Sequence, residues 1–340
     1  MPERTLKVVC APEAWALLAP LVTSREAQGF SVARLAWDAL PTLADAAPGH
    51  VLLVGHPCGS GPLRMPTQIH PPAYRHMASE FHGDHALVHG ALRAAPVHAV
   101  GRLPARTPEA LERMVRKVTA TPPAPPRVIH FLDGDPKWGV AINTVCDRLA
   151  GWCARSDFAR GYEVLRTSFN PVTRGSRADA ARCLTHGAAL WIYVGHGQRH
   201  SVDGLDVAAV TLLDGGASLP LALMACCHAG AFDAEDPALA ETWMASAGGP
   251  RAVVAGSNVT DPRLNPALAL ALAQAALKPG MTAGEAFLLA QRAVLGAPTA
   301  PWAAALRMAA LPGLRRAHAG LYNLLGDPSM LLRPDLSHTI

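Results

Sequence analysis

The segments ALWIYVGHG, residues 189–197, and LPLALMACCHAG, residues 219–230, decide how this chain folds. Each contains an apolar run with the length and composition of a strand that is buried on both faces. Such strands form parallel sheets, in which the carboxyl ends of neighbouring strands share the edge where α/β folds place their ligands. We therefore expect His196, which follows the first run, to lie close to Cys226 and Cys227, which follow the second.

Strand and helix patterns alternate along the rest of the chain, and this alternation predicts an α/β fold with a mostly parallel, doubly wound sheet. Further strands are expected at Leu6–Cys10, Phe30–Ala36, Val51–Val54, His98–Val100, Val128–Leu132, Glu163–Arg166 and Ala252–Gly256. Helices are expected at Pro12–Gln28, Thr107–Thr119, Val140–Cys153 and Asp179–His186, from Pro237 onwards, and between Pro266 and Leu295.

The proline-rich segment TPPAPP, residues 121–126, separates two parts of the chain. Prolines stiffen the backbone and cannot donate to a sheet ladder, so we expect this segment to be a linker. Residues 1–120 then form a smaller α/β subdomain. Residues 127–340 form the larger α/β subdomain, which carries both of the opening motifs.

The composition argues against several classes of protein. Half of the residues are hydrophobic and 16% are charged, which favours a folded core over disorder. A net charge of +4 without clustered basic residues argues against nucleic acid as a partner. No apolar stretch reaches the roughly 18 residues of a membrane span. No signal peptide is recognised and the seven cysteines are odd in number, so we expect a cytoplasmic protein with reduced thiols.

A thiol beside an imidazole is the minimum equipment of a cysteine nucleophile, because the thiolate attacks and the imidazole favours its formation. The alternative is a zinc site, for which the candidate ligands are Cys226, Cys227, His196, His200 and His228. Zinc-binding cysteines usually come as spaced pairs such as Cys-x-x-Cys, which this sequence lacks. The joint pattern, His-Gly after one strand and Cys-x-x-Gly after the next, therefore points to catalysis rather than to a metal.

Two other motifs receive structural interpretations. Glu80, His82, His85 and His89 have spacings that share one helix face, but glycines interrupt the helix pattern, so we expect solvated or structural histidines. The glycine-rich HPCGSG, residues 56–61, lacks the Lys-Ser/Thr pair of a phosphate-binding loop. We predict no metal site and no nucleotide site from these residues.

The motifs Tyr-Val-Gly-His-Gly and Met-Ala-Cys-Cys-His-Ala-Gly-Ala-Phe-Asp resemble those of the gingipain-type cysteine peptidases, relatives of the caspases and legumains. Other segments are also similar to that family: Val51–Gly55, Val100–Pro104, Leu239–Glu241, Gly248–Gly249, Ala252–Ser257 and Leu325–Ser329. The resemblance implies a caspase-like three-layer α/β/α sandwich and a cysteine endopeptidase that works through an acyl-enzyme.

The family spaces its nucleophile as Cys-x-x-Gly with an aromatic residue two positions later. Cys227, Gly230 and Phe232 fit this spacing, whereas Cys226 is one residue off. Because side chains alternate along a strand, the two thiols should face opposite sides, and we expect Cys226 to pack in the core. The resemblance makes His196 the base that partners Cys227.

The resemblance also implies that the backbone N–H groups of Gly197 and Cys227 form an oxyanion hole. A third member of the site is Asp133, which follows the strand Val128–Leu132, with Asp135 as the alternative; a His/Cys dyad without either is equally compatible with the family. Gly230, Asp233 and Glu241 are expected to support the loop after the nucleophile, the two carboxylates through hydrogen bonds to backbone.

The chemistry implied here needs no cofactor, although relatives bind calcium structurally, so calcium is a candidate without assignable ligands. The expected partners are a polypeptide substrate and a protein activator, with neither nucleic acid nor membrane. Three alternatives stay open at this point: a catalytically silent caspase-like module that binds a protein, a transpeptidase that passes the acyl group to another amine, and a metal sensor built on the histidines.

Overall fold

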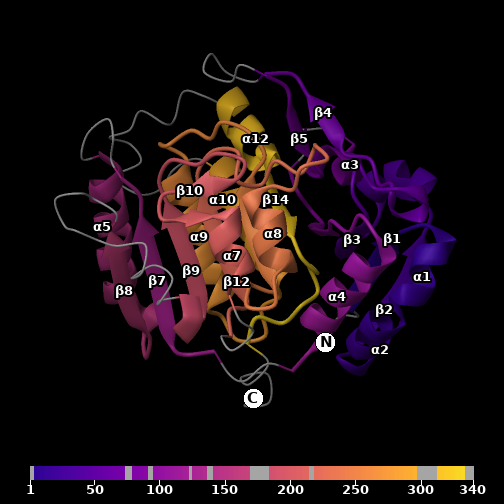
Figure 1. Cartoon of the computed structure of the whole chain (residues 1–340), viewed down its shortest axis with the longest axis horizontal. Coiled ribbons are helices and arrows are strands. Elements are labelled where there is room, and N and C mark those ends of the chain that lie inside the picture. Colours follow the sequence, from indigo (N-terminus) through magenta and orange to yellow (C-terminus); the bar gives the residue numbers. More distant parts are fainter. Residues whose placement is uncertain are drawn as a thin grey trace.

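A ten-stranded sheet forms the centre of the molecule in the computed structural model (Figure 1). The structure describes residues 4–72, 79–90, 95–121, 125–135, 141–168, 184–213, 218–296 and 312–333. In order across the sheet, the strands are β2 (Phe30–Leu35), β1 (Arg4–Val9), β3 (His50–Val54), β6 (Ala99–Leu103), β14 (Tyr322–Leu325), β13 (Ala252–Gly256), β12 (Leu221–Ala225), β9 (Leu190–Val194), β7 (Val128–Asp133) and β8 (Glu163–Ser168).

The predicted mostly parallel sheet is confirmed, because every neighbouring pair of these strands is parallel except β13 and β14. Two small antiparallel hairpins lie outside it, β4 (Gln68–His70) with β5 (Phe81–Gly83) and β10 (Ser201–Val202) with β11 (Leu205–Asp206). The central strands are apolar along their whole length because helices cover both faces of the sheet, as parallel sheets require.

Helices form a layer on each face, which gives the expected three-layer sandwich. One face is covered by α5 (Ala141–Arg155), α9 (Asn265–Ala276), α10 (Ala283–Leu295) and α12 (Pro312–Leu321), with α3 (His85–His89) and the 3₁₀ helix η1 (Trp37–Asp45) over its first strands. The other face is covered by α1 (Pro12–Leu17), α2 (Ala19–Ala27), α4 (Pro108–Thr119), α7 (Val207–Thr211) and α8 (Leu239–Ala245). Two short 3₁₀ helices are η2 (Gly61–Leu63) and η3 (Asp157–Ala159).

Most expected elements are present within a few residues, but the helix expected at Pro12–Gln28 is wrong. It is two helices, α1 and α2, that meet at Leu18. The cause is Pro20, which has no N–H to donate within a continuous helix and instead lies in the first turn of α2. The expected helix Asp179–His186 lies mostly outside the described residues, as do residues 122–124 of the expected linker.

Strand β14, which was not expected, runs between β6 and β13 and so joins the strands of residues 1–120 to those of residues 127–340. The segment after it is fastened by a buried ion pair, in which Arg25 of α2 contacts Asp327 at 2.7 Å. The same guanidinium donates to the Ser329 hydroxyl and to the Val118 carbonyl. All ten strands are therefore one sheet. No helix among the described residues is long and apolar enough to span a bilayer.

Candidate active site

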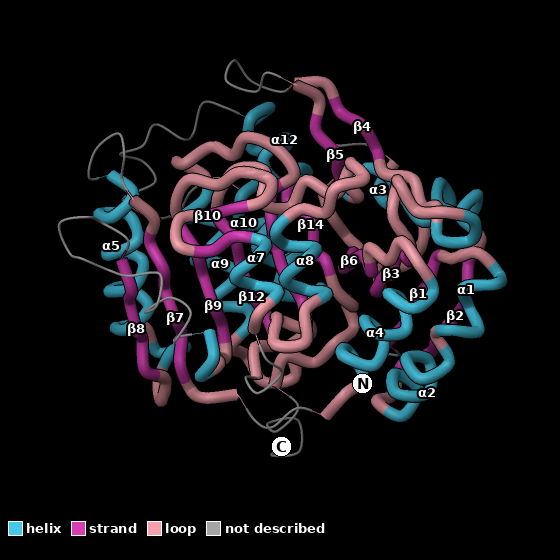
Figure 2. The backbone as a smooth tube through the Cα atoms, in the orientation of Figure 1, coloured by secondary structure: helices cyan, strands magenta, loops and turns pink. Residues whose placement is uncertain are grey.

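The register of the sheet brings the two opening motifs together at one edge. Strands β9 and β12 are parallel neighbours, and Val194 lies opposite Ala225. His196 and Cys227 each follow two residues later, in the loops (pink in Figure 2) that leave the two strands. The expectation that an imidazole and a thiol share this edge is therefore met by the fold.

Close packing at Gly197 presses the loop after β9 against the two cysteines. A Cβ atom at position 197 would lie 2.5 Å from the carbonyl oxygen of Cys227 and 2.6 Å from the sulfur of Cys226. Both distances are far below van der Waals contact, so only glycine fits here. The backbone of the His-Gly motif thus touches the backbone of the nucleophile candidate.

The backbone at His196 is held by a hydrogen bond from a buried tyrosine. Tyr193 donates its hydroxyl hydrogen to the His196 carbonyl at 2.7 Å and accepts the Asp203 N–H at 3.2 Å. Burial raises the pKa of Tyr193 well above its usual range, so the hydroxyl keeps its proton and remains a donor. The imidazole Nε2 of His196 is buried and has no hydrogen-bond partner among the described residues.

The two cysteines have different environments, as the alternation of side chains predicts. Cys226 is fully buried in the core on the helix α8 side of the sheet. Burial raises the pKa of its thiol well above the usual range, which makes it inert. Cys227 is half-buried, and its sulfur accepts a hydrogen bond from the Thr260 N–H at 3.4 Å. The placement of Cys226 in the core is confirmed.

The chain turns sharply directly after Cys227. His228 has a φ of +56°, in the left-handed region that non-glycine residues rarely adopt. The turn is held by the N–H of Ala229, which donates to the Cys227 carbonyl at 2.7 Å, and by the N–H of Gly230, which donates to the Gly256 carbonyl at 2.9 Å. Strained residues of this kind cluster at functional sites, where the surrounding structure enforces them.

Two backbone N–H groups belong to residues of the loops that leave β9 and β12 at this edge. In the described part of the chain, the N–H groups of Gly197 and Cys227 make no hydrogen bond. A polar group that is left unpaired in a folded protein usually has a ligand or water as its partner. These are the two donors that the sequence analysis placed in an oxyanion hole.

Asp133 ends strand β7 at the expected edge of the sheet, opposite Val194 of β9. Its carboxylate is fully buried and accepts hydrogen bonds from Arg166 at 2.9 and 3.1 Å and from Ser168 at 2.7 Å, both on strand β8. No hydrogen bond joins it to the His196 imidazole. Asp135, the alternative, donates its N–H to Asp203 and likewise makes no hydrogen bond to that imidazole. Within the part of the chain that the structure describes, no carboxylate makes a hydrogen bond or ion pair with the His196 imidazole.

Comparisons with known proteins agree with this geometry. The profile of Peptidase family C25 matches residues 30–333. The chain belongs to peptidase family C25.

Solved structures show the same fold for this C25 peptidase, although sequence identity to them is low. A protein titled "Structure of Protease" is 16% identical with a TM-score of 0.73, covering 97% of this chain and 79% of that one. The Arg-specific cysteine proteinase gingipain R is 14% identical with a TM-score of 0.73, covering 96% and 78%. A complex of pro- and mature domains of RgpB from Porphyromonas gingivalis is 14% identical with a TM-score of 0.71, covering 96% and 79%. No curated protein matches the sequence.

Family membership and fold together make the chain a cysteine endopeptidase with a caspase-like fold that acts on polypeptides. The silent binding module and the transpeptidase, which the sequence left open, are not favoured by these findings.

Glu241 supports the loop after the nucleophile of this C25 peptidase. Its carboxylate accepts the N–H of Ala238 at 2.8 Å, contacts His56 at 3.0 Å and pairs with Arg106 at 3.1 Å. The expected bond to backbone is therefore present at Glu241. His56 and Arg106 were missed, because nothing in the HPCGSG motif or in the strand–helix junction near Thr107 pointed to an ion pair.

Asp233 anchors the same loop through side chains rather than through backbone N–H groups. It pairs with Arg199 at 2.5 Å and with His82 of β5 at 3.3 Å. Arg199 also donates to the Ala231 carbonyl within the loop. Gly230, the third supporting residue, packs so tightly that an added Cβ would lie 2.7 Å from the Cβ of Ala255.

The remaining histidines of the Glu80–His89 group are structural. The ring centroids of His85 and His89 lie 4.5 Å apart with the rings tilted by 30°, and the Nε2 of His89 accepts the backbone N–H groups of Val97 and His98. Burial lowers the pKa of His89 to about 3. Across the part of the chain that the structure describes, no group of three or more metal-binding side chains is assembled.

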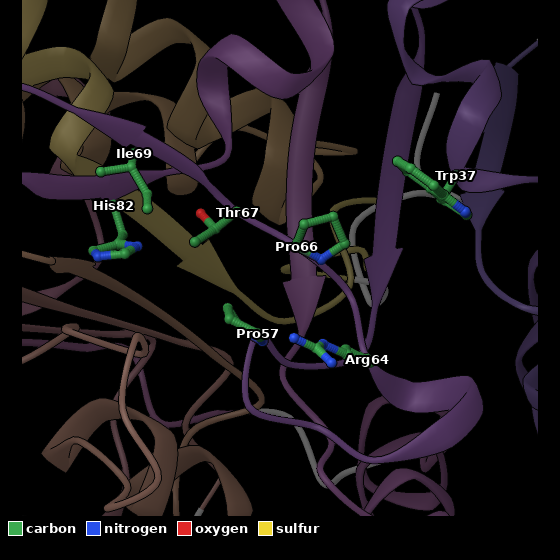
Figure 3. A pocket seen from close by; sticks show the side chains of 7 residues that line it. All are labelled: Trp37, Pro57, Arg64, Pro66, Thr67, Ile69 and His82. Atoms are coloured by element: carbon green, nitrogen blue, oxygen red, sulfur yellow. The ribbon is translucent and has the colours of Figure 1, made fainter.

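A cavity of about 400 Å³ lies next to His82, which pairs with Asp233 in the loop after Cys227 (Figure 3). It is lined by Trp37, Pro57, Arg64, Pro66, Thr67, Ile69 and His82. His82 is the side chain that links the cavity wall to Asp233. The cavity was not expected from the sequence, because its lining comes from η1, from the segments on either side of η2 and from the β4–β5 hairpin, whose meeting no motif indicates.

Proposed function

We propose that this C25 peptidase hydrolyses peptide bonds with Cys227 as nucleophile and His196 as its base. The observation that carries the proposal is the parallel register of β9 and β12, which brings the half-buried Cys227 to the same sheet edge as His196, whose Nε2 has no partner among the described residues. An unpartnered Nε2 can accept the thiol proton and later return it. The fully buried Cys226 is unsuited to the same task.

The reaction follows from these groups. The Cys227 thiolate attacks the substrate carbonyl carbon, and the carbonyl oxygen becomes an oxyanion that accepts the N–H groups of Gly197 and Cys227. The His196 imidazolium then gives its proton to the leaving amine, and the C–N bond breaks to leave a thioester on Cys227. A water molecule, deprotonated by His196, hydrolyses the thioester. One backbone donor to the oxyanion is worth about 3–4 kcal/mol of barrier.

The catalytic unit proposed here is a dyad. Asp133 is engaged by Arg166 and Ser168, so its charge stabilises the β7–β8 edge instead of the imidazolium. The orientation of His196 is supplied by the backbone contact from Tyr193. Cleavage of a positional-scanning fluorogenic peptide library tests the proposal. Loss of cleavage in Cys227→Ala and retention in Cys226→Ala are expected; the reverse pattern would assign the nucleophile to Cys226.

We also propose that the reaction needs no cofactor, since thiol, imidazole and backbone donors supply all of its chemistry. Calcium, which the resemblance suggested, would then act on stability only. Cleavage rates measured after dialysis against a chelator should equal those of the untreated enzyme. A rate restored only by added calcium would give the ion a place in the active conformation.

A protein activator and a cytoplasmic location complete the proposal. A solved relative, RgpB, is a complex of pro- and mature domains, which supports binding of a further polypeptide to this fold. The six described cysteines are free thiols, the form that a reducing cytoplasm maintains. Peptide-cleavage assays with and without an extract of the cells that produce the protein test for an activator. Fractionation of the same cells tests the location.

A further inference from the structure

The sulfur of Cys227 has a second neighbour besides the edge of β9. Thr260, in the loop after β13, places its N–H 3.4 Å and its hydroxyl oxygen 3.8 Å from Cys227 Sγ. Thr260 is 4% exposed, so water competes little for either group. The N–H and the hydroxyl of Thr260 are therefore both within hydrogen-bond distance of Cys227 Sγ.

The hydroxyl of Thr260 is held by Asn265, at the first position of α9. Its side-chain amide contacts the carbonyl oxygen of Ala225 at 3.2 Å and Thr260 Oγ1 at 3.1 Å. A carbonyl oxygen can only accept, so the NH₂ end of the amide faces Ala225. The same NH₂ end then donates to Thr260. The other end of the amide, Oδ1, accepts the hydroxyl hydrogen of Tyr322 at 2.9 Å.

Thr260 Oγ1 therefore accepts one hydrogen bond from Asn265 and still has its own hydrogen to donate, and a thiolate at Cys227 can only accept. Besides the bond from Asn265, the hydrogen bond found for this hydroxyl among the described residues is the one with Cys227 Sγ, at 3.8 Å. Asn265 and Tyr322 are 5% and 1% exposed, so the chain Tyr322, Asn265, Thr260, Cys227 is protected from water throughout. Each hydroxyl or amide in it donates in the direction of the sulfur.

We propose that Thr260 donates two hydrogen bonds to the Cys227 thiolate and thereby sets the fraction of nucleophile that is ionised, with Asn265 and Tyr322 as positioning residues. Hydrogen bonds to a charged acceptor are shorter and stronger than those to a neutral one, so the pair of donors favours thiolate over thiol. Donor distances in a resting site also tighten when charge develops. This inference rests on the proposed role of Cys227 as nucleophile.

The test measures the rate of Cys227 alkylation by iodoacetamide as a function of pH, read by peptide mass spectrometry. Cys58 is an exposed thiol of the same chain, and its rate serves as an internal control. Thr260→Val removes the hydroxyl at nearly constant volume and keeps the N–H. The midpoint of the Cys227 profile should rise by about one pH unit, with a rate near neutral pH reduced about tenfold, while Cys58 is unchanged.

Thr260→Ser keeps the hydroxyl and should reproduce the wild-type profile. Tyr322→Phe, which retains the ring but releases Asn265 Oδ1, should move the midpoint in the same direction by less, and it covers the case in which Thr260→Val fails to fold. A Thr260→Val or Tyr322→Phe profile that superimposes on the wild type in folded protein overturns the proposal. So does a serine variant that behaves like valine, because the lost methyl group would then be the cause.

Peptide cleavage separates this inference from the proposed function. The kcat of Thr260→Val should fall with its thiolate fraction, while KM stays constant. If Cys227→Ala still cleaves peptides, the proposed nucleophile is wrong although the alkylation shift stands. If Cys227→Ala is inactive and the alkylation profile does not shift, the role of Thr260 is wrong while the nucleophile stands.

Discussion

Replacement of Gly197 by alanine tests the close contact between the His-Gly loop and the nucleophile. The added Cβ would lie 2.5 Å from the Cys227 carbonyl oxygen and 2.6 Å from Cys226 Sγ, about 1 Å or more inside van der Waals contact. The atoms on the other side are backbone and a fully buried thiol, neither of which can swing away. The loop carrying the 197 N–H must therefore move.

Two effects of different size follow from this displacement. A shifted oxyanion donor should lower kcat by about 10²–10³, the loss typical of removing one such donor. Overpacking at the same point should reduce the free energy of unfolding by about 1–3 kcal/mol. Since 3 kcal/mol leaves a domain of ordinary stability folded, activity should be lost from folded protein.

The assay compares kcat for a fluorogenic peptide with the urea midpoint for each variant. Gly313→Ala, near the start of α12, is the matched control, because its added Cβ meets nothing within 4 Å. It should keep wild-type kcat and stability. A Gly197→Ala variant that is as active as Gly313→Ala would show that the 197 backbone has no role in the reaction, and the oxyanion hole would have to be sought elsewhere.

Three further predictions concern stability and ions. Arg25→Met leaves the Asp327 carboxylate buried without its cation and should lower the free energy of unfolding by about 3–5 kcal/mol in urea titrations; a loss below about 1 kcal/mol would contradict the fastening role of the pair. Burial lowers the pKa of His89 and His318 to about 3 and that of His130 to about 4, so unfolding takes up protons below pH 6.5. The free energy of unfolding should keep its full value above pH 6.5 and fall below that pH, by up to about 1.4 kcal/mol per pH unit for each histidine. A urea midpoint that stays constant from pH 7 to about 5 would refute this. Added Zn²⁺ should leave the melting temperature unchanged, because the described histidines assemble no metal site; a concentration-dependent rise would reveal one.

The meeting of His196 and Cys227 could be predicted because it depends on one physical rule. Two short apolar runs without polar interruptions are typical of strands buried on both faces, and parallel strands end at one edge. The family spacing Cys-x-x-Gly then selected Cys227, and period-two alternation put Cys226 on the opposite face. These inferences required no knowledge of how the loops fold, and the structure agrees with them.

Features that depend on pairing across the sheet could not be predicted. Asp133 binds Arg166 because β7 and β8 are aligned with Asp133 opposite Ser168, a register that neither strand's composition reveals. Strand β14 is a four-residue segment. One of its two partner strands, β6, lies about two hundred positions earlier in the sequence. Thr260 follows β13 at the same edge as Cys227, so the rule used for the opening motifs could have placed its loop there, although not its two donors.

The central claim is that Cys227, and no other thiol, forms the acyl-enzyme with help from His196. A peptidyl acyloxymethyl ketone, which alkylates a cysteine only after peptide binds at an active site, tests it when the labelled residue is mapped by peptide mass spectrometry. We predict labelling at Cys227 alone, strongly slowed in His196→Ala and unchanged in Cys226→Ala. Labelling at Cys58 or at Cys226, or equal labelling of Cys227 with and without His196, would contradict the account.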